Sequence, residues 1–382
     1  MKINDPNRNI VHMDLDSFYV SVECLERSEL KGKPLIIGGA GDRGVVASCS
    51  YEARKFGIHS AMPSKTARKL CPHAIWLQGN MEKYSRYSNL VTEIIKDKSP
   101  LYEKASIDEF YLDVSGMDKF FGCYKWTSEL KQFIMKETGL PISFALSPNK
   151  TVSKIGTGEA KPNGEKHIPF GSEKSFLNPL PVRKIPGIGP QTESYLTSLG
   201  ISRIATLAET PVSVLQSIFG KNGIEIWERA NGIDDSPVIP FSERKSISNE
   251  TTFEQDSMDI KMVQSKIIKM AEGLAFELRK DAWLTGCVAI KIKYSNFETK
   301  TIQATIPYTS ADDILIETAK ELFTKLYRQR MLIRLIGVKF TNLIKGNYQI
   351  SIFDNPVKKI ALTQSIDKLR NRYGDDIVGR AV

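Results

Sequence analysis

The sequence has few of the residues from which disulfide frameworks and zinc sites are built. Only five of its 382 residues are cysteines and four are histidines, and the cysteines show no C-x-x-C spacing. Neither a disulfide framework nor a zinc site is therefore indicated. Apolar runs are also short: none approaches the ~18 residues of a membrane span, and residues 1–6 lack the apolar core of a signal peptide. We expect a cytoplasmic protein with no membrane partner.

Positive charge is what the chain has in excess. The formal net charge is +9, with 41% hydrophobic and 25% charged residues, which is the composition of a globular protein able to bury a core. A charge excess of this sign favours a polyanionic partner such as nucleic acid, although it is also compatible with mere solubility. The length of the chain predicts several domains rather than one.

Two adjacent carboxylates open a strand-like run in the first third of the chain. Asp108 and Glu109 head the sequence Phe-Tyr-Leu-Asp-Val, which is rich in aromatic and aliphatic residues. In a regular strand these two side chains would point to opposite faces, so they can reach one ion only where a turn or a strand start breaks the period. The alternative is a solvated turn, since most acidic pairs are surface features.

A second acidic strand end lies near the N-terminus. The apolar run of residues 10–13 ends on Asp14, and a helical pattern follows over residues 18–26. Asp14, Asp108 and Glu109 can then converge, and oxygen ligands of this kind suit Mg²⁺. Two such ions about 3.5–4 Å apart stabilise the attacking and leaving oxygens of a phosphoryl transfer.

A strand-to-helix transition offers a second set of polar groups. Ser48, Tyr51 and Arg54 line one edge of it, so that two hydroxyls lie beside a planar guanidinium that suits bidentate phosphate binding. A lone arginine on a helix is more often part of a solvated face. The residues alone leave both interpretations open.

Two later segments favour contact with a phosphate backbone. Residues 182–190 have the form of a helix-hairpin-helix turn, in which Gly187 and Gly189 let backbone amides approach a phosphate; an ordinary helical hairpin is the alternative. After a polar linker, the pattern runs strand, helix, strand, strand, helix, strand, which predicts a second α+β unit. Two of its strands alternate apolar with basic residues, giving either a solvated face or one suited to DNA. The basic residues are Lys291, Lys293, Arg334 and Lys339.

Four strings carry a family resemblance: residues 10–19, 105–114, 45–63 and 160–164. They resemble the Y-family, lesion-bypass DNA polymerases, in particular the DNA polymerase IV branch, over about residues 8–345. The resemblance implies an α+β multidomain fold with a ferredoxin-like palm, fingers, a helical helix-hairpin-helix thumb and a separate α+β little finger. The expected boundaries are 1–30 and 75–170 for the palm, 31–74 for the fingers, 171–241 for the thumb, 242–249 for a linker, 250–345 for the little finger and 346–382 for a C-terminal tail.

The resemblance also implies roles for individual residues. Asp14, Asp108 and the Leu15 carbonyl would hold the nucleotide-side Mg²⁺, while Asp14, Asp108 and Glu109 would hold the Mg²⁺ that activates the primer hydroxyl; Mn²⁺ can substitute. Tyr19 would be a steric gate under the sugar, whereas periodicity favours a core position for Phe18. Lys161, in a K-P-N-G segment, would neutralise the departing pyrophosphate. The implied nucleotide contacts are Phe18, Tyr19, Ser48, Tyr51, Arg54 and Lys161.

These residues predict a template-directed DNA polymerase that acts as a monomer. The primer 3′-hydroxyl would attack the α-phosphate of a paired dNTP, and pyrophosphate would leave. No segment indicates an exonuclease, so proofreading is not expected. Two alternatives stay open: a palm-type nucleotidyl cyclase, which needs no helix-hairpin-helix thumb, and a non-catalytic DNA-binding scaffold, which needs no converging carboxylates.

The tail contains one further motif. The pentapeptide Gln349-Ile350-Ser351-Ile352-Phe353 resembles the Q-L-S/D-L-F peptide by which bacterial polymerases dock on the sliding clamp. The alternation of Ile350 and Ile352 also fits an edge strand of the last domain. We expect the bacterial sliding clamp as a partner, and a short amphipathic helix over residues 358–373.

Overall fold

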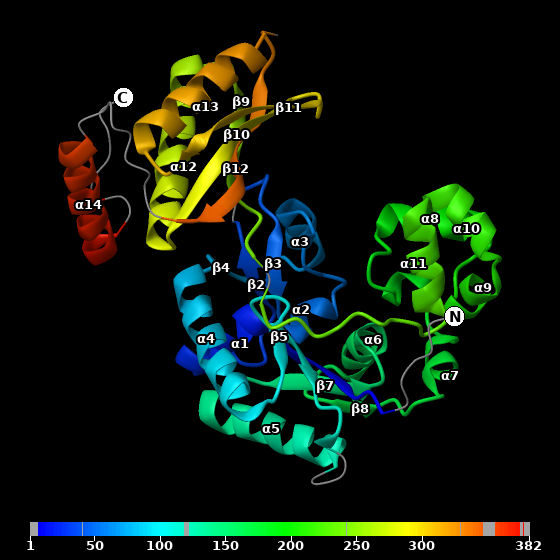
Figure 1. The fold of residues 1–382 in the computed structure, drawn as a ribbon. Helices are drawn as coiled ribbons and strands as arrows, with labels where there is room; N and C mark the ends of the chain where they lie inside the picture. The colour runs from blue at the N-terminus through cyan, green and yellow to red at the C-terminus, as the bar shows by residue number, and fades with distance from the viewer. Residues whose placement is uncertain are drawn as a thin grey trace. The chain divides into compact units, whose positions relative to one another are not determined.

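The chain forms two compact units, Met1–Ser242 and Glu243–Val382, in the computed structural model (Figure 1). The first unit contains two sheets and the second unit one, and each unit has its own hydrophobic core. The described residues are 7–39, 41–117, 122–241, 243–328, 330–346, 356–374 and 377. None of the helices in these ranges is long and apolar enough to span a bilayer.

A five-stranded sheet with strand order β5-β6-β1-β7-β8 is the centre of the first unit. The central strand β1 is antiparallel to both β6 and β7. Its Val11, Met13 and Leu15 side chains enter a core that includes residues of α4 and α5, and because strand side chains alternate, Asp14 belongs to the opposite face. The strands are β1 Ile10–Leu15, β5 Tyr102–Lys104, β6 Glu109–Asp113, β7 Ile142–Ser147 and β8 Glu165–His167.

Helices cover both faces of this sheet, with α5 and α6 on opposite sides (Figure 1). Helix α6 begins after Asn149, whose side chain caps it by accepting a hydrogen bond from the Val152 amide. Gly156 lets α6 lie close to β7, because a Cβ there would come within 2.8 Å of the Ala145 Cβ. The helices are α1 Phe18–Glu26, α4 Met81–Lys98, α5 Cys123–Thr138 and α6 Lys150–Ala160.

Two smaller parts complete the first unit. A three-stranded sheet, order β3-β2-β4, packs on two short helices around a core that contains Ile36 and Val46; its elements are β2 Leu35–Gly38, β3 Val46–Cys49, β4 Ile75–Leu77, α2 Tyr51–Arg54 and α3 Ser64–Leu70. A helical part encloses Leu196, Leu207 and Leu215. Its elements are α7 Glu173–Leu177, the 3-10 turn Val182–Lys184, α8 Pro190–Ser198, α9 Ile204–Glu209, α10 Val212–Phe219 and α11 Lys221–Ala230.

The second unit has a four-stranded antiparallel sheet, order β11-β10-β12-β9. The predicted order of strand, helix, strand, strand, helix, strand is confirmed, and α12 and α13 share one core with the sheet. Residues 246–249, which we expected in the linker, are instead the start of β9, because they pair with β12 from Val338 to Thr341. The elements are β9 Ser246–Ser257, α12 Ile260–Lys280, β10 Trp283–Tyr294, β11 Thr299–Thr309, α13 Asp312–Leu326 and β12 Ile333–Lys345.

A last helix, α14 (Pro356–Tyr373), confirms the helix expected in the tail. It folds back on its own unit: the Arg279 guanidinium donates to both oxygens of Asp367 at 2.6 and 2.8 Å, and to Asp312 at 2.7 Å. The pentapeptide Gln349–Phe353 lies outside the described residues.

Candidate active site

The structure brings the three predicted carboxylates together at one end of β1 and β6. Asp14 lies opposite Glu109 in the antiparallel register, and the Leu15 amide donates a 3.0 Å hydrogen bond to the Asp108 carbonyl. Glu109 is the first residue of β6 and Asp108 lies in the bend before it. The prediction that the acidic pair sits at a strand start is therefore confirmed.

Asp14 is partly buried among charged groups of both signs. Burial raises the pKa of its carboxyl, the Lys161 ammonium opposes that effect, and the Asp108 and Glu109 carboxylates add to it; the resulting pKa is about 6. The Lys161 ammonium makes an ion pair with Asp14 and lies 3.5 Å from the Leu15 carbonyl oxygen. The negative charge that accumulates here is thus met by a cation from the chain itself.

The other two carboxylates also have close partners. Lys154 donates to both Glu109 oxygens at 2.6 Å, and the Ser106 hydroxyl donates to Asp108 at 2.6 Å. Within the described ranges, no three His, Cys, Asp or Glu side chains are arranged to hold a metal ion; ammonium groups lie against two of the three carboxylates instead.

The donor set nevertheless fits a hard divalent cation. The Lys161 ammonium lies against the Asp14 carboxylate and near the Leu15 carbonyl, and these are two of the oxygens expected to hold the nucleotide-side ion. Oxygen donors and local negative charge are what Mg²⁺ requires. The position of the Lys161 ammonium therefore shows that these oxygens can bind a cation.

Asp16 is a central residue that the sequence reasoning missed. Its side chain is 2% exposed and accepts hydrogen bonds from the Ser143 hydroxyl at 2.9 Å, the Asn163 amide at 2.6 Å and the Tyr51 hydroxyl at 3.3 Å. It thereby joins β7, the turn after α6 and the start of α2. The signal was present as the repeated acid in Asp14-Leu15-Asp16.

The two aromatic residues after Asp16 have different environments. Phe18 is 2% exposed and belongs to the core, which is the position that periodicity favoured. Tyr19 is half-buried and stacks on Tyr84, with ring centroids 4.3 Å apart; the Tyr84 hydroxyl is anchored on Glu23 at 2.9 Å. Burial raises the pKa of Tyr19, and the charge of Asp108 raises it further, because the ring lies near that carboxylate.

Of the predicted phosphate-binding residues, Tyr51 lies beside the acidic site, because its hydroxyl donates to Asp16. The Arg54 guanidinium stacks over the Tyr51 ring, 4.9 Å from its centroid, and Arg54 is exposed while Ser48 is buried in β3. Burial raises the pKa of the Tyr51 hydroxyl, and the Asp16 and Asp14 charges contribute. Tyr51 and Arg54 thus adjoin the acidic site, whereas Ser48 offers little accessible surface.

The predicted DNA contacts fall in the two separate units. Gly187 has a φ of 95° and lies with Gly189 in the turn before α8, and the Arg229 guanidinium fixes this turn by donating to the Pro186 carbonyl at 2.6 Å. The turn is therefore a rigid one with a conformation that favours glycine.

In the second unit, the four basic residues lie on β10 and β12. Lys291 pairs with Glu250 at 2.9 Å, while Lys293 and Arg334 both lie over the Phe297 ring, 5.4 and 4.7 Å from its centroid. Arg334 occupies a break in the register with β9, and Lys339 is exposed. The acid beside Lys291 reduces the positive character of this face, which the sequence pattern did not indicate.

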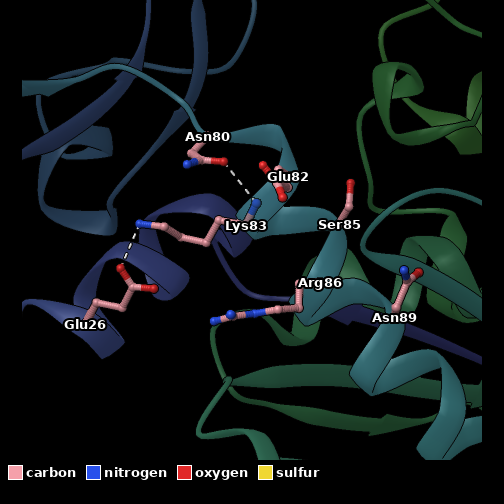
Figure 2. Close-up of a pocket in the computed structure, with 7 residues that line it drawn as sticks. All are labelled: Glu26, Asn80, Glu82, Lys83, Ser85, Arg86 and Asn89. Atoms are coloured by element: carbon pink, nitrogen blue, oxygen red, sulfur yellow. Dashed lines mark hydrogen bonds and ion pairs between the residues drawn. The ribbon is translucent and has the colours of Figure 1, made fainter. Parts of the chain in front are cut away.

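A separate hollow of about 730 Å³ lies against α1 and α4 (Figure 2). Within it, the Lys83 ammonium pairs with Glu26 at 2.8 Å, and Asn80 caps α4 by accepting from the Lys83 amide. Figure 2 shows all seven lining residues, none of which is a predicted site residue: Glu26, Asn80, Glu82, Lys83, Ser85, Arg86 and Asn89. The hollow and the acidic site are thus different features.

Three family models match the chain in succession. Residues 13–158 match the impB/mucB/samB family, residues 171–201 the IMS family HHH motif, and residues 244–352 the impB/mucB/samB family C-terminal domain. A DNA polymerase IV of Dehalococcoides mccartyi is 40% identical over 371 residues, which are 96% of this chain and 95% of that protein.

Solved structures show the same similarity. A Y-family DNA polymerase chimera built on Dbh superposes with a TM-score of 0.77 at 27% identity, and an insertion ternary complex of Dbh DNA polymerase with a TM-score of 0.63 at 26% identity. Each comparison covers 88% of this chain and 100% of the other.

Proposed function

Because the chain belongs to the impB/mucB/samB family of Y-family, translesion DNA polymerases, we propose that Asp14, Asp108 and Glu109 carry its DNA-directed nucleotidyl transfer from a dNTP to a primer 3′-hydroxyl. The observation that carries this assignment is the convergence of the three carboxylates where β1 and β6 meet, each with a close polar partner. The nucleotidyl cyclase and the scaffold protein are not favoured. Primer extension by variants of single carboxylates tests the assignment.

A divalent metal dependence follows from membership of this family. Asp14, Asp108 and the Leu15 carbonyl would hold the nucleotide-side Mg²⁺, and Asp14, Asp108 and Glu109 the second ion. When bound, such ions lower the pKa of a hydroxyl and neutralise charge that develops on phosphate oxygens. The protein supplies the carboxylates. The hydrogen bond from the Leu15 amide to the Asp108 carbonyl holds the end of β1 next to the residue that precedes β6, so that Asp14 and Asp108 stay close together.

The residues around the carboxylates would bind and orient the nucleotide. Arg54 and Lys161 supply cations for the triphosphate, and Tyr51 supplies a hydroxyl whose position Asp16 fixes. Tyr19 would lie under the sugar, where its stacking on Tyr84 prevents the ring from moving aside. Asp16 would be a positioning residue, because it accepts hydrogen bonds both from Tyr51 and from the Asn163 amide in the turn that follows Lys161.

The parts of the fold correspond to polymerase domains. We assign the five-stranded sheet and its helices to the palm, the three-stranded sheet to the fingers, the helical part to the thumb and the second unit to the little finger (Figure 1). The fingers then extend beyond the expected residue 74 to include β4, which pairs with β2. The linker then ends before Ser246. We propose that the protein acts on primer-template DNA with a dNTP, as in the insertion ternary complex in which one structural relative was solved, and that it does so as a monomer.

Binding of DNA is expected to depend strongly on salt and little on sequence. The helix-hairpin-helix amides and the basic strand face would bind phosphates, so the removal of one lysine–phosphate ion pair should make the slope of log K against log salt shallower by about 1. Reversing the charge at Lys291 and Lys293 to Glu should therefore weaken binding about equally on unrelated duplexes. Fluorescence anisotropy over a range of about 50 to 200 mM salt measures both the affinity and the slope.

A control is Lys325→Glu, which makes at one exposed site on α13 the charge change that the double variant makes at each of its two sites. This variant should bind DNA as the unmodified protein does. An equal loss of affinity in Lys325→Glu, or a flat salt dependence of the unmodified protein, would remove the strand face from the DNA-binding surface.

The tail peptide is proposed to bind the bacterial sliding clamp. The apolar side chains of Ile352 and Phe353 would enter a hydrophobic groove, with Gln349 as a polar anchor. Changing Ile352 and Phe353 to Ala should reduce clamp binding by about 100-fold, because two buried anchors each contribute ~1–2 kcal/mol, and should abolish clamp-stimulated synthesis. Surface plasmon resonance with immobilised clamp measures the affinity, and primer extension with loaded clamp measures the stimulation.

The matched control changes Leu362 and Leu369 of α14 to Ala, since both are exposed apolar residues of the same tail. This control and the Ile352, Phe353 variant should both keep basal extension. If clamp stimulation survives the change at Ile352 and Phe353, the docking role must be given up.

A further inference from the structure

Two lysines of α6 and the lysine that follows the helix lie against acidic residues of the sheet. Lys150 and Lys154 lie one turn apart on α6, and Lys161 is the residue that caps its C-terminal end. A spacing of four and then seven residues places all three on one side of a helix. The three lysines therefore form a row because of the periodicity of α6.

Each lysine in this row pairs with an acid from a different strand. Lys150 pairs with Glu103 of β5 at 2.7 Å, Lys154 with Glu109 of β6 at 2.6 Å, and Lys161 with Asp14 of β1. The three strands are consecutive neighbours in the sheet, in the order β5-β6-β1. Lys150, Lys154 and Lys161 thus supply one counter-charge to each of these three strands.

We propose that Lys154 is a positioning residue that acts as the internal counter-ion of Glu109 and competes with the divalent ion for that carboxylate. The inference rests on the proposed role of Glu109 as a metal ligand. Both Glu109 oxygens accept from Lys154, so an ion that binds this carboxylate competes with the ammonium for the same two oxygens.

The exposure of the pair permits such an exchange. The Lys154 and Glu109 side chains are 34% and 24% exposed, so the displaced ammonium can be solvated as it leaves. A lysine suits this role, because its flexible stem and compact charge can withdraw without breaking a fixed bidentate fork. Lys154 would keep Glu109 oriented at the head of β6 and prevent the uncompensated repulsion that three neighbouring carboxylates would otherwise produce.

The neighbouring pair provides a comparison within the same helix. Lys150 and Glu103 have nearly the same separation, but they are 14% and 21% exposed, and Glu103 also accepts from the Ile239 amide at 2.8 Å. Lys150 donates as well to the Pro237 carbonyl at 3.4 Å. This pair joins α6 to the segment that follows α11, and neither of its two residues is an expected metal ligand.

The test is binding of Mn²⁺ to the free protein, followed by the electron paramagnetic resonance signal of the unbound ion, without DNA or nucleotide. Lys154→Met keeps the length of the side chain and removes its charge. It should lower the Kd for Mn²⁺ by about tenfold, since one competing unit charge is removed from a partly exposed site. Lys150→Met should leave the Kd unchanged.

Three further variants make the outcome decisive. Asp108→Ala should abolish the Mn²⁺ binding of the site, and its failure to do so would overturn the proposed metal site itself. In the Glu109→Gln background, Lys154→Met should give no further gain, because the pair is already broken. Lys154→Arg, which keeps the charge if the Met variant does not fold, should bind Mn²⁺ no more tightly than the unmodified protein.

If Asp108→Ala abolishes binding but Lys154→Met leaves the Kd unchanged, the counter-ion role is wrong while the metal site stands. An equal gain in Lys150→Met would also overturn the role, because it would show a general effect of charge. Tighter binding by Lys154→Arg would contradict it in the same way.

Discussion

Asp108→Ala is expected to abolish nucleotide transfer while leaving DNA affinity within about twofold. Removing this ligand would cost several kcal/mol of transition-state stabilisation, which corresponds to a loss of about 10³-fold or more in rate. The DNA-binding surface is expected elsewhere, in the turn before α8 and on β10 and β12. Glu109→Ala should have a similar effect. Single-turnover incorporation measures the rate, and fluorescence anisotropy with a primer-template measures the affinity.

The matched control for this prediction is Asp113→Ala. Asp113 lies at the other end of β6 and accepts a hydrogen bond from the Ser115 amide, so it tests the loss of one carboxylate from the same strand. Its incorporation rate should stay close to that of the unmodified protein. Extension by either Asp108→Ala or Glu109→Ala at a normal rate would remove these carboxylates from the active site.

Tyr19→Ala is expected to lower the discrimination between dNTP and rNTP by about 100-fold, because a site that excludes a group by shape loses that exclusion when the wall is removed. The structure supports a rigid wall: the Tyr19 ring stacks on Tyr84, which is fully buried and hydrogen-bonded to Glu23. The measurement is the ratio of kcat/KM for dCTP and CTP opposite a template guanine.

Phe18→Leu distinguishes the two neighbouring rings. Phe18 is a core residue at 2% exposure, so this smaller change should lower the unfolding temperature and leave the selectivity ratio much as it was. If selectivity is unchanged in Tyr19→Ala and lost in Phe18→Leu, the gate is Phe18.

The carboxylate site could be predicted because its signal is local. Asp14 and Glu109 each mark the boundary of an apolar run, and strand propensity together with the family resemblance was enough to bring them together. Phe18 could be placed in the core for the same reason, since helical periodicity is visible over a few residues.

The partners of those carboxylates could not be predicted in the same way. The contact of Lys154 with Glu109 depends on how α6 lies across the sheet, and the contacts of Asp16 with Ser143 and Asn163 span about 130 to 150 residues of chain. Pairing of this kind follows from tertiary packing, which no short window of sequence contains. The start of β9 was missed because residues 246–249 are polar except for Ile247, and only their pairing with β12 makes them a strand.

Charge complementarity on the second unit was hidden for a similar reason. The alternation in β10 predicted a basic face with Lys291 on it, but Glu250 comes from β9, which reaches Lys291 only across the intervening β12. The ion pair between Arg279 of α12 and Asp367 of α14 was not predicted either, because the two residues meet only in the folded unit. A sequence pattern shows which residues of one strand or helix share a face. Which other element packs against that face depends on the topology of the fold.

Primer extension with one dNTP at a time shows whether this protein is a template-directed DNA polymerase whose reaction depends on Asp108. The protein, Mg²⁺ and a primer-template are combined, with each of the four bases and an abasic site as the templating position, and both the extended primer and pyrophosphate are measured. We expect nucleotide to be consumed only when primer-template is present, the complementary nucleotide to be favoured opposite each intact base, and Asp108→Ala to form neither product. Consumption of nucleotide without DNA, or extension that Asp108→Ala leaves intact, would contradict it.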